Sequence, residues 1–284
     1  MLGQMSLKPR FGEQRLVRTD VNFAHRAAFR ILGVAEPAHY LHHKYLRLAL
    51  DRVNGLDPES ILDAGCGSGD HTFYLARRFP RAEVLGVDID EGLIVRNRVV
   101  AAALGLRNIT FEVASIAEPL SRLFDVIVSI DVLEHLVEQQ KALHGLCNAL
   151  APRGVAFFHV PTIRPRPVPF SRWLADFHAW AEHEHLADDL TAEQFEQRVA
   201  AAGFKVSESW RTFGYWAGEM ATSLFALPYR NSLHNRALQL MLAPICRALV
   251  GFDRVGRHHV RYAVALLLTK DDRAKRYDLR TRPI

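Results

Sequence analysis

The segment that most constrains the fold runs from Ile61 to Thr72 and reads ILDAGCGSGDHT. Its apolar start predicts a strand, the glycines Gly65, Gly67 and Gly69 predict a tight turn, and the residues after them predict a helix. Glycine has no Cβ, so a turn of this kind lets backbone approach a ligand closely, and the start of the helix adds free N–H groups. The segment therefore predicts a strand–turn–helix unit that binds a small ligand at its turn.

Short apolar runs alternate with helical patterns along most of the chain. Strands are predicted at 61–62, 83–87, 109–113, 124–130, 155–160, 205–210 and 260–268. Helices are predicted near 69–79, 91–104, 133–150 and 191–202. Alternation of this kind is typical of a doubly wound α/β fold, and strands that are apolar on both faces fit a parallel sheet covered by helices on both sides.

Three regions lie outside this alternation. Residues 1–57 carry amphipathic patterns and predict an N-terminal helical cap, while 271–284 predict a charged tail. Residues 212–259 are long and apolar with helical spacing, which predicts a helical lid inserted before the last strand. A helix that only packs on the domain, or a surface that rests on a membrane, are the alternatives for this insertion. Residues 58–270 are then one ligand-binding domain.

Two acids near the glycine turn limit which class of ligand can bind there. A dinucleotide fingerprint needs a third glycine where this chain has Asp70, and that carboxylate would repel a pyrophosphate. Asp88 ends the second predicted strand, where a carboxylate can accept hydrogen bonds from the two hydroxyls of a ribose. The pair favours a ligand that carries a nucleoside and an amino acid without phosphate.

Four motifs carry a resemblance to a known family: 62–69 (LDAGCGSG), 86–88 (GVD), 124–135 (FDVIVSIDVLEH) and 150–155 (LAPRGV). They resemble the class I S-adenosylmethionine-dependent methyltransferases, in particular the group with the ubiquinone-biosynthesis O-methyltransferases. The resemblance covers about residues 58–211 and the last strand. It implies a Rossmann-like, mainly parallel seven-stranded sheet with an antiparallel last strand, and S-adenosyl-L-methionine as the cofactor.

The same resemblance implies roles for individual residues. Asp63, Gly65, Gly67 and Gly69 would hold the methionine part of the cofactor, Asp88 the ribose, and Ile89 the adenine. Ser115 stands where relatives usually have an acid that reaches the adenine amine. Further cofactor contacts are expected at Cys66, Ile116 and Ile130.

Histidines and acids beyond the glycine turn are the candidates for the chemistry. Transfer of a methyl group to a hydroxyl requires the loss of a proton, so a nearby base helps. His185 is the first candidate base, with His183 and His159 as weaker ones, and His135 is a second candidate catalytic residue. Asp131, Glu134 and His135 have the spacing that relatives use for a divalent metal, but packing and capping are the favoured explanation of this pattern. His42 and His43 are interpreted as a pair on a helix surface.

Composition limits the partners and the compartment. The net charge of +5 is modest for 284 residues, and no basic stripe with interleaved aromatic residues predicts a nucleic-acid partner. Three widely spaced cysteines form no disulfide framework, which suits a cytoplasmic protein, and no signal peptide or transmembrane run is visible.

The acceptor is expected to be a small or lipid-like molecule, methylated at a hydroxyl oxygen, and peripheral membrane contact stays open. Transfer to nitrogen or carbon, and a cofactor-binding module without catalysis, are the alternatives.

Overall fold

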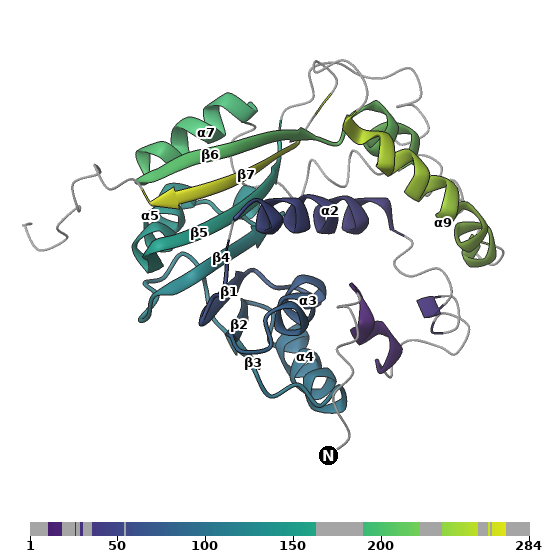
Figure 1. Cartoon of the computed structure of the whole chain (residues 1–284), viewed down its shortest axis with the longest axis horizontal. Helices are drawn as coiled ribbons and strands as arrows, with labels where there is room; N and C mark the ends of the chain where they lie inside the picture. Colours follow the sequence, from purple (N-terminus) through teal and green to yellow (C-terminus); the bar gives the residue numbers. More distant parts are fainter. Residues whose placement is uncertain are drawn as a thin grey trace, which may run out of the picture.

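The structure is a computed structural model that describes residues 11–18, 26, 29–30, 36–53, 55–162, 190–221, 235–254, 261 and 263–270 (Figure 1). Its strands are β1 (Ser60–Ala64), β2 (Glu83–Asp88), β3 (Ile109–Val113), β4 (Phe124–Ile130), β5 (Leu150–Pro161), β6 (Phe204–Thr212) and β7 (Ala263–Lys270). Its α-helices are α2 (Pro37–Arg52), α3 (Asp70–Arg78), α4 (Glu91–Ala103), α5 (Gln139–Ala149), α7 (Ala192–Ala201) and α9 (Asn235–Gly251). Short 3-10 helices span Glu13–Leu16, Leu133–His135 and Phe252–Arg254, and a π-helix spans Tyr215–Ala221.

The strands form one sheet in the order β3-β2-β1-β4-β5-β7-β6. The pairs from β3 through β5 are parallel, and β7 runs antiparallel to both β5 and β6. The predicted seven-stranded, mainly parallel sheet with an antiparallel last strand is confirmed. The order reverses at β1 and β4, and ligands of such sheets bind outside the carboxyl ends of the strands at this point.

Helices cover both faces of the sheet (Figure 1), and an apolar cluster lies on each face. On one face α2, α3, α4 and part of α9 pack against side chains such as Ile61, Val126 and Phe157. On the other face α5 and α7 pack against Ile127 and Phe158. Neighbouring residues of one strand thus point to opposite faces, and both faces of the sheet are buried under helices, as the continuous apolar runs predict.

The connection between β4 and β5 differs from the prediction of one helix over 133–150. Residues 133–135 form a 3-10 turn, and α5 begins only at Gln139. The side-chain amide of Gln139 donates to the carbonyl of Leu133 at 2.9 Å, so a side-chain hydrogen bond connects the 3-10 turn to the start of α5. The strand β5 then begins at Leu150, so it includes residues 152–154, which lie between the predicted helix and the predicted strand. The register of its pairing with β4 shifts at these residues, as it does at a β-bulge.

The described part of the insertion packs on α2. Asp253, which follows α9 and is 1% exposed, accepts hydrogen bonds from the hydroxyl of Tyr45 at 2.8 Å and from the N–H of Gly214 at 2.8 Å. The ammonium group of Lys44 donates to the carbonyl of Val250 at 2.9 Å. Helix α2 is therefore held between the sheet and α9. Within the described residues, no helix is both long and apolar enough to span a membrane.

Candidate functional site

The glycine turn lies at the carboxyl edge of the sheet, directly after β1. Gly65, Gly67 and Gly69 have φ angles of 82°, 50° and 77°, in the left-handed region that favours glycine. The N–H groups of Gly65 and Cys66 donate to the carbonyl of Val87, at 2.9 and 2.8 Å. The end of β2 therefore holds the start of the turn in place.

The space around the turn differs from one glycine to the next. A Cβ at Gly65 would lie 2.4 and 2.5 Å from the two methyl carbons of Val132. Among the described residues, a Cβ at Gly67 would meet nothing within 4 Å. The turn is thus packed against the residues that follow β4 at one glycine, and it is open at the next, where a ligand can reach the backbone.

Asp88 connects the end of β2 to this open part of the turn. Its Oδ2 accepts the N–H of Gly67 at 2.8 Å, and its Oδ1 accepts the N–H of Asp90 at 3.0 Å. Each carboxylate oxygen can accept a further hydrogen bond. The next side chain, Ile89, is 76% exposed. A carboxylate beside an open apolar side chain suits the ribose and the adenine of a nucleoside, the roles predicted for these two residues.

Asp63 lies beneath the turn and is 3% exposed. Burial raises the pKa of this carboxyl group to about 7, although the hydroxyl of Thr72 donates to its Oδ2 at 2.6 Å and partly offsets the rise. A cationic group bound nearby would favour the ionised carboxylate and lower that pKa again. Binding of an ammonium group at the turn should therefore release a proton from Asp63.

This coupling predicts that affinity for S-adenosylhomocysteine depends on pH. Between pH 8 and pH 6 the free protein protonates Asp63 while the complex keeps it ionised, so the affinity should fall about tenfold. Calorimetric titrations across this range measure the effect. The matched control is Asp63→Asn, whose affinity should be lower and flat with pH. An equal pH dependence in the variant would show that another group titrates.

The remaining predicted cofactor contacts differ in how open they are. Cys66 is buried, and burial raises the pKa of its thiol, which therefore stays protonated. The side chain of Ile116 packs in the core on the α5 face, whereas Ser115 is half-buried and its Oγ accepts the N–H of Ala117 at 3.2 Å. Ile130 is half-buried at the end of β4. Ser115 and Ile130 thus remain more accessible to a ligand than Cys66 and Ile116.

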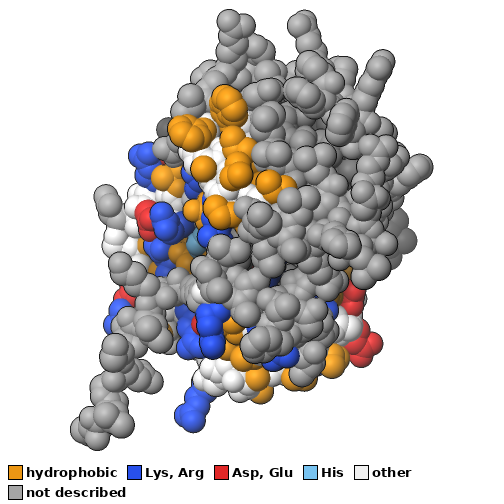
Figure 2. Space-filling view, turned by 90° about the vertical axis from the view of Figure 1, so that its right-hand side faces the viewer, with side chains coloured by type: hydrophobic (Ala, Val, Ile, Leu, Met, Phe, Trp, Pro, Cys, Tyr) orange, Lys and Arg blue, Asp and Glu red, His pale blue; other side chains and the backbone are white. Residues whose placement is uncertain are grey.

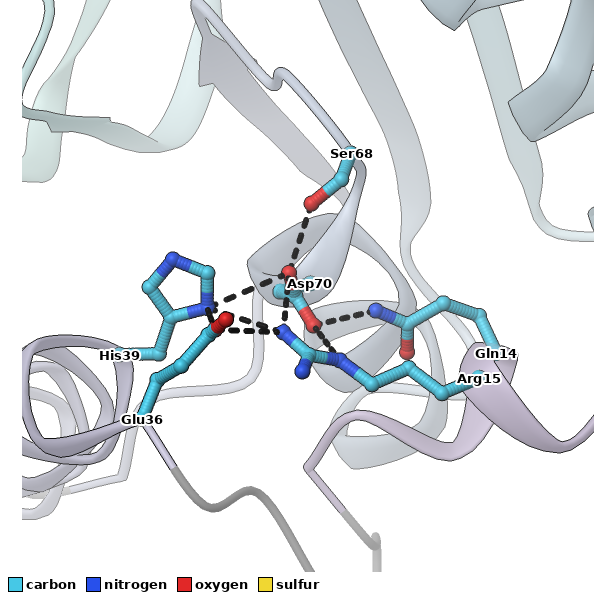
Figure 3. Close-up of polar contacts among 6 residues, drawn as sticks. All are labelled: Gln14, Arg15, Glu36, His39, Ser68 and Asp70. Atoms are coloured by element: carbon cyan, nitrogen blue, oxygen red, sulfur yellow. Dashed lines mark hydrogen bonds and ion pairs between the residues drawn. The ribbon is translucent and has the colours of Figure 1, made fainter. Parts of the chain in front are cut away.

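Asp70 has a role that the sequence did not reveal (Figure 3). It is the first residue of α3 and 5% exposed, and it accepts hydrogen bonds from Gln14, Arg15 and Ser68. Burial alone would raise the pKa of Asp70, but the charges of Arg15 and His39 lower it to about 2. Asp70 therefore anchors N-terminal residues beside the glycine turn, and its charge is paired rather than directed at a ligand.

Asp131 follows β4 in a strained conformation, with a φ of 52°. Its carboxylate lies between two imidazoles: Oδ2 is 3.1 Å from Nε2 of His42, and Oδ1 is 2.7 Å from Nδ1 of His159. The other ring nitrogen of His159 is 2.9 Å from the hydroxyl of Thr212. Burial would raise the pKa of Asp131, but the two imidazoles lower it, so the carboxylate is ionised. Helix α2, β4 and β5 thus place one acid between two histidines.

His42 corrects the interpretation of a surface pair on a helix. It is 4% exposed and belongs to the buried stripe that Tyr45, Leu46 and Ala49 form on α2. The spacing i, i+3, i+4 and i+7 is the signal that could have placed it inside. His43 is half-buried and stacks on Phe11 with ring centroids 4.1 Å apart.

The other candidate residues are placed as follows. Glu134 is 8% exposed, and burial together with the charge of Asp131 raises its pKa well above the ordinary value. The side chain of His135 is 38% exposed, and its Nε2 lies 3.8 Å from Glu134. In the described part of the chain, Asp131 converges with His42 and His159 rather than with these two residues. His183 and His185 lie outside the described residues.

Comparison with known proteins agrees with the fold. Residues 57–213 match the family model described as a methyltransferase domain. The trans-aconitate 2-methyltransferase of Deinococcus radiodurans is 33% identical over 57% of this chain and 57% of its own. A ubiquinone biosynthesis O-methyltransferase of Acinetobacter baumannii is 24% identical over 54% of this chain and 70% of its own. The chain thus spans only about 57% of the length of the first of these relatives.

A solved structure extends the likeness to most of the chain. The geranyl diphosphate C-methyltransferase of Streptomyces coelicolor, crystallised with Mg²⁺, geranyl diphosphate and S-adenosyl-L-homocysteine, has a TM-score of 0.58 and 14% identity. The match covers 92% of this chain and 89% of that one, and at this identity it speaks for the fold. The chain belongs to the methyltransferase-domain family, with the fold of a class I enzyme and S-adenosylmethionine as its cofactor.

Proposed function

We propose that this protein transfers the methyl group of S-adenosylmethionine to a hydroxyl oxygen of a small or lipid-like acceptor. The observation that carries the proposal is the seating of Asp88 on the N–H of Gly67, next to the open face of the turn and the exposed Ile89. This arrangement presents an acceptor pair for a ribose and an apolar surface for a base.

The residues of the turn fit the cofactor. Gly67, where a side chain would meet nothing, leaves room for a ligand against the backbone. Asp88 and Ile89 would hold the nucleoside, and Asp63 would stabilise the ammonium group of the methionine part from below. Bound S-adenosylmethionine supplies an electrophilic methyl group. The chain's own task is then to orient the acceptor in line with it and to accept or release a proton.

The acceptor is assigned to the space outside the carboxyl ends of β4 and β5. Val132 contacts the turn at Gly65, so Asp131 and the 3-10 turn after it lie directly beside the cofactor loop. His135, whose side chain is 38% exposed, is the candidate base on this side. His185, which lies outside the described residues, stays a candidate base from the sequence alone. A set of Asp131, Glu134 and His135 as metal ligands is less well supported, because Asp131 faces other histidines.

The lid is part of the proposal. Residues 212–259 are proposed to cover the acceptor pocket, with 1–57 as the cap of the domain at 58–270. Support comes from α9, which packs on α2, the helix that brings His42 beside Asp131. Ile245 of α9 and Phe252 after it are 51% and 54% exposed. The side of the molecule that carries α9 is turned to the viewer in Figure 2, where apolar side chains gather beside Lys and Arg. Such a surface suits a lipid-like acceptor.

Incubation with methyl-labelled S-adenosylmethionine tests the function. The acceptor panel contains matched alcohols, amines and activated carbon acids, each in a water-soluble and a lipid-like form. Label should enter the alcohols, and mass spectrometry with NMR should locate it as a methoxy group. Label only in amines or on carbon would move the assignment to the alternatives. If the protein binds the cofactor but methylates no member of the panel, it would be a cofactor-binding module without catalysis.

A second arm tests the bases in the same assay. His135→Ala and His185→Ala should each lower kcat, while calorimetry shows nearly unchanged affinity for S-adenosylhomocysteine. His144→Ala is the matched control, because His144 lies on α5, the helix that packs on the opposite face of the sheet from α2. Full turnover in one of the two variants would remove that histidine from the mechanism.

A further inference from the structure

Three side chains from distant parts of the chain converge near the carboxyl ends of β4 and β5, which we call the acceptor edge of the sheet because the proposed acceptor would lie there. They are His42 of α2, Asp131 after β4 and His159 of β5, and one ligand atom from each lies within 4.8 Å of the others. His42 and His159 are 4% and 1% exposed, whereas the side chain of Asp131 is 39% exposed. The cluster is thus closed on the histidine side and open at the carboxylate.

Hydrogen bonding within the cluster does not satisfy it. Nε2 of His42 is buried and lies 3.1 Å from Oδ2 of Asp131, yet it makes no hydrogen bond there or to any other described group. A buried polar atom without a partner is unusual in a folded protein. This nitrogen lies beside a carboxylate whose other oxygen is already in contact with Nδ1 of His159. A cation between the three groups would give Nε2 a partner.

The second imidazole is prepared for the same role. Nε2 of His159 lies 2.9 Å from the hydroxyl of Thr212, which fixes the ring and leaves Nδ1 toward Asp131. Histidines that bind metals commonly donate their other ring N–H to a neighbouring oxygen, because this fixes the tautomer and the orientation. Asp131 is itself held in place by its N–H, which donates to the carbonyl of His159 at 3.0 Å.

We propose that His42, Asp131 and His159 bind a divalent transition-metal ion at the acceptor edge of the sheet. Two imidazole nitrogens and one carboxylate oxygen suit Zn²⁺ and its neighbours in the first transition row, whereas Mg²⁺ and Ca²⁺ prefer oxygen ligands. Three protein ligands leave a position open, and the exposed side of Asp131 places that position toward solvent. An acceptor oxygen would complete the coordination, and this last role rests on the proposed function, while the metal site itself does not.

Metal titration of the full-length protein tests the site. After treatment with chelator, the protein should bind one equivalent of Zn²⁺ by calorimetry, and Co²⁺ should give visible absorption bands of low coordination number. His42→Ala should weaken Zn²⁺ binding at least 100-fold, and Thr212→Val should weaken it about 10- to 100-fold through the orientation of His159. His144→Ala removes a histidine outside the cluster and should bind Zn²⁺ as the parent does.

S-adenosylhomocysteine affinity, measured on every variant, reports whether the cofactor half of the protein is intact. The proposal is overturned if the parent protein does not bind Zn²⁺. The three side chains would then be held together by hydrogen bonds and ion pairs without a metal. The proposal is also overturned if His42→Ala and Thr212→Val bind Zn²⁺ like the parent while both bind the cofactor product. Zn²⁺ binding without any methyl transfer would contradict the proposed function and leave the metal site standing.

Discussion

Replacing Gly65 by alanine should destabilise the protein more than any other single change at the turn, and it should also weaken cofactor binding. The added Cβ would lie 2.4 and 2.5 Å from the methyl carbons of Val132, and the residue must keep a φ of 82°. The left-handed conformation costs roughly 1–2 kcal/mol for a residue with a Cβ, and overpacking of a tight contact costs about 1–3 kcal/mol. We expect the free energy of unfolding to fall by about 2–5 kcal/mol and the affinity for S-adenosylhomocysteine to fall at least tenfold.

The affinity falls because a shift of the turn away from Val132 moves it off its anchor on the carbonyl of Val87. Urea unfolding and calorimetry measure the two effects. Gly55→Ala is the control for backbone strain alone, since Gly55 has a φ of 68° and nothing within 4 Å of its Cβ position. Val132→Ala removes the two closest carbons and should recover part of both losses in the double variant. A Gly65→Ala protein that binds the cofactor product like the parent would contradict the role of this contact.

Asp88→Ala should produce the largest loss of cofactor affinity with the smallest loss of stability. The carboxylate is expected to accept two hydrogen bonds from the ribose, and charge-assisted hydrogen bonds of this kind together contribute on the order of 2–4 kcal/mol. Affinity for S-adenosylhomocysteine should therefore fall on the order of 30- to 1000-fold. The fold should survive, because Asp88 is the last residue of β2 and is only half-buried.

Two variants separate ribose binding from support of the turn. Asp88 also accepts the N–H of Gly67, so its removal loosens the turn. Asp88→Asn keeps an acceptor for this N–H but loses the charge, and it should retain an intermediate affinity. Asp90→Ala removes the side-chain cap of α4, which accepts the N–H of Leu93 at 3.0 Å, and should cost about 1 kcal/mol of stability without loss of affinity. Unchanged affinity in a folded Asp88→Ala protein would exclude Asp88 as the ribose ligand.

Local patterns in the sequence determined the elements of the sheet and the cofactor side of the site. Apolar runs such as 124–130 read as strands because both of their faces are buried, and the capping-box sequence at Thr191 begins α7 with both expected hydrogen bonds. The glycines of the turn and Asp88 could be predicted to lie together for the same reason: they belong to one strand–turn–helix unit and the strand after it, where chain spacing sets spatial spacing. Their role in binding the cofactor stays a prediction.

Only the tertiary structure decided which polar side chains meet. His42 lies on α2, Asp131 follows β4 and His159 lies in β5, while Asp70 pairs with Arg15 and His39 from segments before the first strand. Periodicity tells whether a residue faces inward, but not which residue of another element faces it. Helix α5 likewise begins at Gln139 rather than at 133. The side chain of Gln139 donates a hydrogen bond to the carbonyl of Leu133, and this contact cannot be recognised from helical spacing in the sequence. The cofactor turn is thus local in the chain, whereas the acceptor edge depends on contacts across the sheet, which form only when the whole domain packs.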